Sequence, residues 1–549
     1  MMMKRACILV LAAACGTSAT KPDEPTSPPV LIITAPARGT NVDGGSVTVS
    51  GTATVSTGTP TVTINSAGVA VGSDGSFSAD VQVAPGISLI ETHAIDETGS
   101  DTRDVRAVLA GTLATSDGSE QTTIAAEASP AALTAIGGAI ASDAKAIDFT
   151  QAAQALNPVY DNTGCLGAVI DITSIALKDI DVALAPQANA LATDVTIDDI
   201  TVKLSASYKV ACIGGSTTIT VGATAAHISG DLGASISAGK IATTLPSVTV
   251  TLDGFTLDVS SLPSELTDLV SGAVKSAVQN SLASMIESKV PPLADSKLAG
   301  LVAKSFSGKI LGETTALTVT PSKSTISTAG LYIELGAKTL VTGGAGGTYY
   351  SAPMPASPAL MAQSADLGVA VECDLVNSLL AGLWAAGAFD KTVPASDLSL
   401  AAALLDPNAT QLALSLSLPP TVTSDGTGNL QLAMGDAMIS VEDAGGTQLQ
   451  QLALSLQTAV AASATNGSVA LTLGTPTVFA TVTEQADDGA RALSDSEVET
   501  LVSGVWPIIG GQASSALANL PLPSVAGVTL GAPTVTGAPG YLVADLPLH

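Results

Sequence analysis

The chain is poor in aromatic, histidine and basic residues. Its 549 residues include two Trp, six Tyr, six Phe and three His, and charged residues make up only 12%. Twenty basic residues stand against 48 acidic ones, which gives a formal net charge of −28. Nucleic-acid binding and docking on anionic lipid headgroups both need clustered Lys and Arg. The composition therefore disfavours both kinds of partner.

Sequence motifs of catalysis are also lacking. The chain has no Gly-x-Ser-x-Gly, no HExxH, no P-loop and no Cys-x-x-Cys, and its histidines at 93, 227 and 549 lie in unrelated settings. Sugar sites need stacking aromatics, which are scarce here. The 48 acids still allow many spatial pairs, so a glycosidase-like carboxylate pair is left open. We expect no enzyme, no cofactor and no metal site. Asp96, Glu97 and Asp101 favour a solvated turn over a calcium site.

Beyond the first residues there is no uninterrupted apolar run of about 18 residues, so no transmembrane helix is expected. Residues 1–15 have the pattern of a signal peptide, with Lys4 and Arg5 before an apolar stretch. It ends in Ala-Ala-Ala-Cys15, which predicts acylation of Cys15 as a lipid anchor; the alternative is ordinary cleavage with Cys15 incidental. Residues 16–28 form a Ser/Thr/Pro-rich tether. We therefore expect an outer-membrane lipoprotein that faces the periplasm or the cell surface.

Short alternating runs fill residues 29–110. Segments such as 46–50, 61–64 and 77–83 alternate Val or Ile with Thr or Ser, and turn signals fall between them. This pattern is typical of an antiparallel sandwich. It is similar to bacterial immunoglobulin-like repeats, which usually serve as spacers. Residues 111–124 are expected to be a linker.

Residues 125–345 begin with helical sequence at about 123–156 and continue with long alternating segments at 168–179, 193–211, 217–232 and 248–259. The alternation predicts a curved antiparallel sheet with one wet face. An amphipathic helix at about 263–286, continuing past the two prolines to 306, would lie against it. Residues 346–362 are expected to link this domain to a second one at 363–549. There Ser494 and Glu497 form a capping box for a late helix, which Pro507 would kink.

Two segments of the second half carry a family resemblance. A strand at 366–372 feeds a helix bearing Asn377, Trp384 and Gly387, and the late helix closes on Pro-Leu-Pro523 with Gly527 following. This arrangement resembles the carboxy-terminal half of the bactericidal/permeability-increasing protein family. That family includes the lipopolysaccharide-binding and cholesteryl ester transfer proteins, which are tubular lipid binders. The acidity of this chain departs from the cationic tip of its lipopolysaccharide-binding relatives.

The resemblance implies an α+β fold of two tandem domains, each a curved antiparallel sheet wrapped on a long helix, in an elongated two-part body behind the immunoglobulin-like sandwich. It also implies a disulfide between Cys165 and Cys212, which an exported protein permits. Cys373 is then left single, buried and inert.

The implied function is non-enzymatic binding, and possibly transfer, of phospholipid or another acyl lipid in an apolar tunnel. The alternative is a structural or adhesive envelope protein without a lipid ligand; an envelope hydrolase is a further rival. A Trp in the middle of an apolar helix, such as Trp384, is more often core than ligand contact, and the apolar stripes at 266–286 and 498–517 could simply pack on a sheet. The expected lining residues lie on helix faces: Leu266, Val270, Val274, Val278, Leu282, Leu379, Leu383, Val498, Leu501, Val505 and Ile509.

Overall fold

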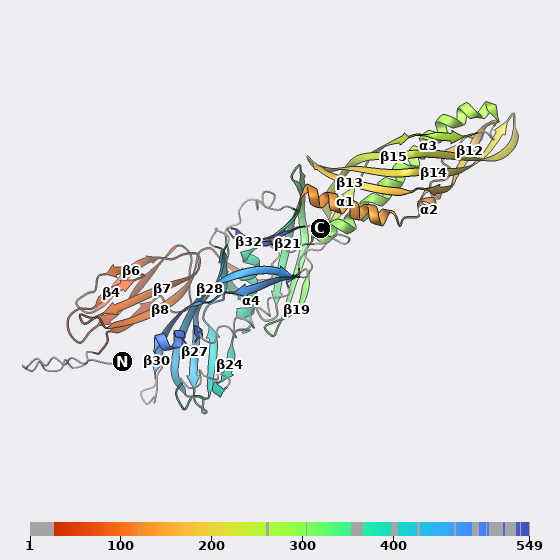
Figure 1. Cartoon of the computed structure of the whole chain (residues 1–549). Helices are drawn as coiled ribbons and strands as arrows, with labels where there is room; N and C mark the ends of the chain where they lie inside the picture. The colour runs from red at the N-terminus through yellow and green to blue at the C-terminus, as the bar shows by residue number, and fades with distance from the viewer. Residues whose placement is uncertain are drawn as a thin grey trace, which may run out of the picture. The chain divides into compact units, whose positions relative to one another are not determined.

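The computed structural model describes residues 27–119, 121–259, 263–302, 305–352, 366–396, 405–424, 429–465, 468–485, 494–500, 502–503, 520–521, 534–538 and 540–547. The described chain is mostly β, with few helices (Figure 1). It divides into two compact units. The first holds residues up to Pro36, Thr48–Val81 and Glu91–Asp104; the second holds Ala37–Val47, Gln82–Ile90 and Val105–His549. No helix among the described residues is long and apolar enough to cross a membrane.

Residues 30–110 form two small β-sheets, as the short alternating runs predict. Val62 and Ile64 are buried while Thr61 is exposed, so side chains of one parity make the core. One sheet has the order β1-β3-β6 and the other β2-β8-β7-β4-β5. Their bounds are β1 Val30–Ala35, β2 Thr40–Val42, β3 Ser46–Thr54, β4 Thr61–Ile64, β5 Ala67–Val69, β6 Ser76–Gln82, β7 Gly86–Ile95 and β8 Asp101–Ala110.

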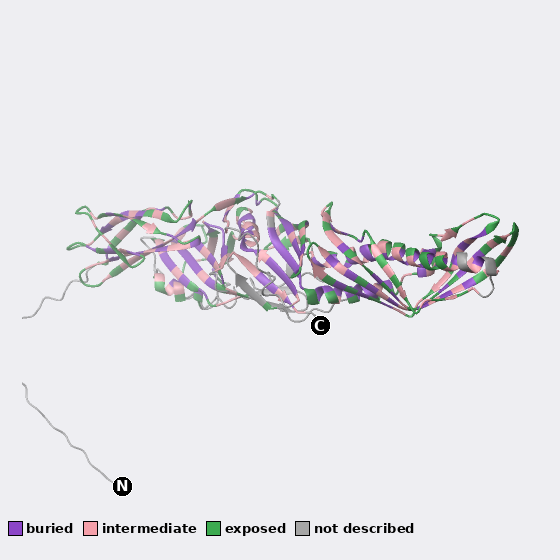
Figure 2. Ribbon diagram, turned by 90° about the horizontal axis from the view of Figure 1, so that it is seen from above, coloured by how far each residue is buried: buried purple, intermediate pink, exposed green. Residues whose placement is uncertain are grey.

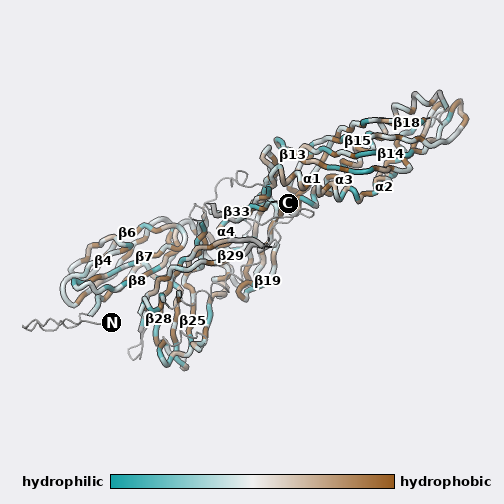
Figure 3. Tube along the Cα trace, in the orientation of Figure 1, coloured by the Kyte–Doolittle hydropathy of each residue, from teal (hydrophilic) through white to brown (hydrophobic). Residues whose placement is uncertain are grey.

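An eight-stranded antiparallel sheet follows, built on two very long strands. These are β14 (Ala190–Val210) and β15 (Ile213–Ser237), which pair along almost the whole of β14. Hydrophobic and hydrophilic residues alternate along both (Figure 3), and Figure 2 shows the matching alternation of burial. The other strands are β11 Tyr160–Asp161, β12 Leu166–Ala176, β13 Asp179–Gln187, β16 Lys240–Thr244, β17 Val248–Asp253 and β18 Thr256–Asp258.

Three α-helices accompany this sheet. Helix α1 (Pro130–Ala144) begins at Ser129, whose hydroxyl accepts a hydrogen bond from the backbone N–H of Ala132 at 3.2 Å. Helix α2 spans Phe149–Gln154. Helix α3 (Ser264–Leu298) runs through Pro291 and Pro292 for 35 residues and passes into the 3₁₀ turn η1, Ala299–Leu301. The long helix predicted from the apolar spacing is present, and it continues past the prolines.

A seven-stranded sheet joins the two halves of the second unit, in the order β19-β20-β21-β10-β23-β33-β32. Strand β10 (Gln121–Ala128) lies between β21 and β23, whereas the sequence predicts helix from residue 123. That prediction is wrong because backbone pairing on both sides, with partners more than 200 residues away in sequence, outweighs the local preference. The other strands are β19 Phe306–Ile310, β20 Glu313–Ser327, β21 Gly330–Val341, β23 Leu367–Glu372, β32 Thr534–Ala538 and β33 Tyr541–Leu546.

A further eight-stranded sheet, helix α4 (Cys373–Ala385) and the start of a late helix belong to the second half. Helix α4 follows β23 directly. The sheet strands are β24 Lys391–Pro394, β25 Gln411–Leu416, β26 Thr421–Ser424, β27 Leu430–Glu442, β28 Gln448–Thr465, β29 Ser468–Leu473, β30 Thr477–Gln485 and β31 Leu520–Pro521. The expected capping box of the late helix is formed: Ser494 N–H donates to Glu497 Oε2 at 2.9 Å, and Glu497 N–H donates to Ser494 Oγ at 3.4 Å.

Two segments predicted as linkers contain paired strands. Strand β9 (Leu113–Ser116) lies within the first and pairs with β22 (Gly347–Tyr350) in the second. The glycines at 344 and 347 pack on α4: a Cβ on Gly344 would lie 2.1 Å from the carbonyl oxygen of Gly382, and one on Gly347 would lie 2.3 Å from that of Ala381. Glycine is therefore needed here for close backbone approach rather than for flexibility.

Candidate functional site

The apolar face of α3 is buried along its length. Leu266, Val270, Val274, Val278 and Leu282, all expected lining residues, are between 0% and 3% exposed. They recur every four residues, so they share one side of the helix. The stripe continues through Met285, Ile286 and Val290 to Leu298.

These side chains belong to one continuous hydrophobic cluster. It contains residues of α1, of α3, of strands β12 to β16 and of one face of the central sheet. Among its buried members in the described chain, Phe149 is the one aromatic, and all the others are Ala, Val, Leu, Ile or Met. Aliphatic side chains of this kind make contacts that are nondirectional, and an acyl chain offers the same chemistry.

Helix α1 and helix α3 meet the sheet in different ways. Helix α1 lies very close to β13, where a Cβ on Gly137 would lie 2.5 Å from the carbonyl oxygen of Val182. The described hydrogen bonds from α3 to the sheet all reach β16 or β17, at one margin. Lys275 adds a cation–π contact there, with Nζ 5.3 Å from the ring centroid of Phe255.

Three polar side chains attach α3 to that margin. The Asp295 carboxylate accepts from the Thr243 backbone N–H at 2.6 Å and from its hydroxyl at 2.7 Å. Glu287 Oε1 accepts from the Val248 N–H at 3.2 Å, and Gln279 Nε2 donates to the Val250 carbonyl at 2.7 Å. At its far end α3 contacts α1, because Lys297 Nζ lies 2.7 Å from Asp143 Oδ2. Sequence reasoning missed these residues, since polar positions on an amphipathic helix usually face water.

The expected lining residues of the second half do not gather in one place. Leu383 is 1% exposed and packs with Val341 and Ala388, beside the half-buried Leu379. Val498 is 2% exposed but belongs to a different cluster, which includes Val502 and residues of the last large sheet. Leu501, Val505 and Ile509 lie outside the described residues, as does Cys15.

The residues that carry the family resemblance in α4 have structural roles. Asn377 donates to the carbonyls of Tyr350 and Val422 at 3.2 and 3.1 Å, and accepts from the Val422 N–H at 2.8 Å. Trp384 Nε1 donates to the Leu416 carbonyl at 2.7 Å. Gly387, with φ of 78°, ends the helix in the left-handed region. For Trp384 these contacts favour the core interpretation over a ligand contact.

A disulfide joins Cys165 to Cys212, the pair implied by the resemblance. It links the start of β12 to the turn between β14 and β15. Two large aliphatic side chains next to it are exposed: Leu166 by 52% and Ile213 by 75%. Both lie beside Val210, because Leu166 and Ile213 pair with it from opposite sides. The free Cys373 is buried, and burial raises the pKa of its thiol to about 12, which leaves it unreactive.

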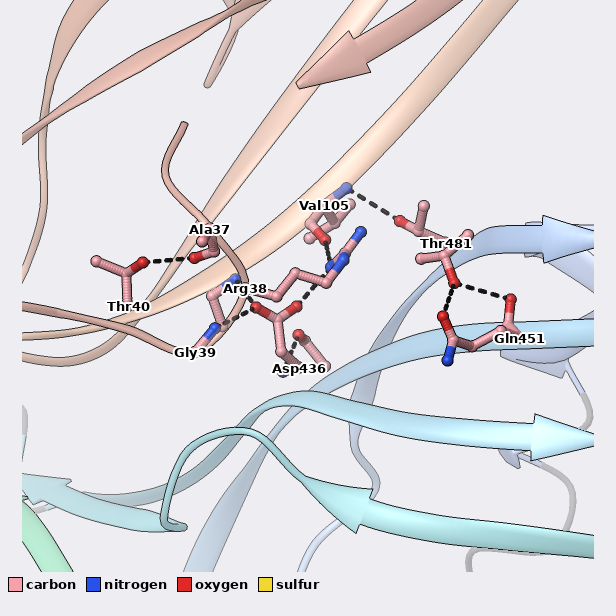
Figure 4. Close-up of polar contacts among 11 residues, drawn as sticks. Ala37, Arg38, Gly39, Thr40, Val105, Asp436, Gln451 and Thr481 are labelled. Atoms are coloured by element: carbon pink, nitrogen blue, oxygen red, sulfur yellow. Dashed lines mark hydrogen bonds and ion pairs between the residues drawn. The ribbon is translucent and has the colours of Figure 1, made fainter. Parts of the chain in front are cut away.

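Within the second unit, Arg38 and Asp436 form a buried ion pair (Figure 4). Arg38 Nη1 lies 2.6 Å from Asp436 Oδ1 and donates to the Val105 carbonyl at 2.7 Å. Asp436 Oδ2 accepts from the N–H groups of Gly39 and Ala107 at 3.3 and 3.1 Å. Burial raises the pKa of Asp436, and the Arg38 charge opposes that rise.

Asp436 occupies a bulge of β27 and has a φ of 48°, which turns its side chain out of the regular ladder. A Gly before an Asp inside an alternating strand is the sequence signal that marks such a position, here Gly435.

Comparisons with known proteins give a match to a family model and similarities to solved structures. Residues 29–112 match the model of glucodextranase, domain B. The chain is similar to the crystal structure of lipopolysaccharide binding protein at 10% identity and a TM-score of 0.47, covering 78% of this chain and 99% of that one. It is similar to the solution structure of latherin at 17% identity and a TM-score of 0.22, covering 31% and 85%. No curated protein matches. Both TM-scores lie below 0.5, so a function has to follow from this chain's own residues.

Proposed function

We propose that this protein binds acyl lipid between α3 and the sheet of β12 to β16, without covalent chemistry. The observation that carries the proposal is the uneven attachment of α3. Its described polar contacts to the sheet lie on the β16–β17 margin, and the rest of its buried face is aliphatic apart from Ser281 and Lys297. Acyl chains enter along the aliphatic part, where protein–protein contacts are exchanged for equivalent protein–lipid contacts.

The energetics favour such an exchange. Transfer of an acyl chain from water yields about 0.8 kcal/mol per buried methylene, hence on the order of 12 kcal/mol gross for about sixteen methylenes. The side chains that give way recover their aliphatic contacts with the lipid. Headgroups stay in water, so no charged clamp is required.

The remaining parts of the proposal concern where the protein works. An acylated Cys15 anchors it in the cell envelope behind the tether of residues 16–28. Phospholipids are abundant acyl lipids in an envelope and are the proposed ligands. Transfer between membranes is the proposed use, because binding without covalent chemistry is reversible.

An overpacking variant tests whether the α3 face is a lipid site or dry core. Val278→Phe adds volume to a 3% exposed position, and Asn280→Asp, at an exposed position of the same helix, is the matched control. Uptake of pyrene-labelled phosphatidylcholine from vesicles and urea unfolding are measured on the unacylated full chain.

At a lipid site, we expect Val278→Phe to lower lipid uptake several-fold while stability falls by less than about 1 kcal/mol, because the ring occupies lipid space. In a dry core, the same ring costs about 1–3 kcal/mol. That loss of stability, with no lipid uptake by the wild type, would contradict the proposal.

A further inference from the structure

One face of the central sheet carries a buried carboxylate, Glu127, and a half-buried one, Asp545, in place of apolar side chains. Glu127 on β10 pairs with Gly368 on β23, and Gly368 pairs with Asp545 on β33. Residues paired in this way point to the same face. The two carboxylates therefore flank a position that has no side chain.

The neighbours on this face are Ala, Val and Tyr side chains and two further acids, of which Glu334 pairs with Ala125. Ala125, Tyr332, Ala370 and Val543 form a cluster with Tyr541 packed against it. Glu372, two residues beyond Ala370 on the same side of β23, is 6% exposed. The opposite face of the same strands belongs to the large aliphatic cluster.

The carboxylates lack the partners that buried acids require. Glu127 is 2% exposed and its Oε2 makes no hydrogen bond; the buried Oδ1 of Asp545 makes none either. The Thr123 hydroxyl, on the same strand as Glu127 and 3% exposed, is a third buried oxygen without a partner. Native proteins rarely leave such atoms unpaired, because each costs the full desolvation of the group.

The two acids lie two strand spacings apart. Adjacent strands lie about 4.8 Å apart, so the Cα atoms of Glu127 and Asp545 are roughly 9.6 Å apart across Gly368. Lys323, on β20 of the same sheet, already pairs with Glu334 at 3.1 Å.

We propose that Glu127 and Asp545 bind the ammonium group of an amine-bearing amphiphile. A primary ammonium has three N–H donors and a positive charge, and so satisfies both carboxylate oxygens at once. Its alkyl chain lies on the small apolar side chains of the same face. Divalent metal ions fit less well, because they need about six oxygen ligands, and the described residues hold no group of three His, Cys, Asp or Glu placed to bind one. This polar site is separate from the α3 site and does not depend on it.

Binding of dodecylammonium to the unacylated full chain tests the proposal. Titration calorimetry at about pH 8.5, where the amine is charged, compares it with dodecanol, which lacks the charge, and with dodecyltrimethylammonium, which lacks N–H donors. We expect dodecylammonium to bind at least about tenfold more tightly than either. In Glu127→Gln/Asp545→Asn that advantage disappears, and in the control Glu334→Gln it persists.

Three results would overturn the assignment. They are equal binding of dodecanol or of dodecyltrimethylammonium, an undiminished advantage in the double variant, and displacement of dodecylammonium by millimolar Ca²⁺. The wild-type comparison of the three probes decides the matter even if the double variant fails to fold. Phospholipid uptake at the α3 site is measured in parallel, and its loss or retention leaves this conclusion unchanged.

Discussion

At the scale of single residues, the buried charges of this protein differ in how fully they are paired. Asp436 has Arg38 and two backbone N–H groups around it. Glu127 and Asp545 each keep an oxygen without a donor. A paired buried charge fixes local structure, whereas an unpaired one is available to a ligand or a proton. Removing the paired charge of Asp436 should therefore destabilise the protein, whereas removing the charge of Glu127 should stabilise it.

Replacing Asp436 with Ala should destabilise the protein strongly. The variant removes the carboxylate that lies 2.6 Å from the Arg38 guanidinium, whose side chain is 14% exposed. We expect a loss of about 3–5 kcal/mol in the free energy of unfolding, measured with urea. The double variant Arg38→Met/Asp436→Leu removes both charges and should lose much less. A loss below about 1 kcal/mol in Asp436→Ala would contradict the assigned role.

Replacing Glu127 with Gln should stabilise the protein at alkaline pH. Burial, and next the charge of Asp545, raise the pKa of Glu127 from 4.5 to about 7. The folded state thus holds a proton that the unfolded state releases, so the stability that this proton contributes is fully present below pH 4.5 and is lost as pH rises to about 7. Glu127→Gln should flatten that part of the pH profile and gain roughly 2–3 kcal/mol at about pH 8. An unchanged urea profile from about pH 5 to 8 would refute the assignment.

At the scale of elements, local sequence patterns predict the pieces better than their partners. The 3.6-residue spacing from Leu266 onward predicts α3, and the Ser494–Glu497 capping box predicts a helix start that the structure contains. Alternation predicts the sandwich strands and β14. Local patterns do not predict strand β10, because it forms by pairing with β21 and β23, which lie far away in the sequence.

Sites formed by residues that are far apart in the sequence could not be predicted from the sequence. Nothing local shows that Thr243 meets Asp295, or that Glu127 meets Asp545 across Gly368. A lone Glu among the small apolar residues of β10 marks an unusual position in the sequence, but it does not show which residue lies opposite it in the sheet. Helical spacing locates the expected lining residues on α3, yet whether lipid or protein fills the space beside them is a matter of packing.

The hairpin end that carries the disulfide offers a test of membrane contact. Ile213 is 75% exposed, so Ile213→Asp should leave folding unchanged. If this end inserts into the bilayer, the variant takes up pyrene-labelled lipid several-fold more slowly, with the same final amount bound. Leu340→Asp, at a 53% exposed position of β21, is the matched control. Equal uptake rates for both variants would mean that lipid enters elsewhere.

At the scale of the whole molecule, composition and packing both indicate an aliphatic interior. A chain with 46% hydrophobic and only 3% aromatic residues builds its interior from aliphatic side chains. One continuous cluster runs from the helices through the long sheet to the central sheet. The net charge of −28 disfavours anionic surfaces, so the proposed lipid binding relies on acyl chains rather than on headgroups.

The most direct test is native mass spectrometry of the unacylated full chain purified from a bacterial periplasm, followed by solvent extraction and analysis of the extract. The proposal predicts one or two acyl lipids per chain, with a lower lipid occupancy in Val278→Phe. A protein that carries no lipid, and takes up none from phospholipid vesicles, would contradict it and favour a structural role in the envelope.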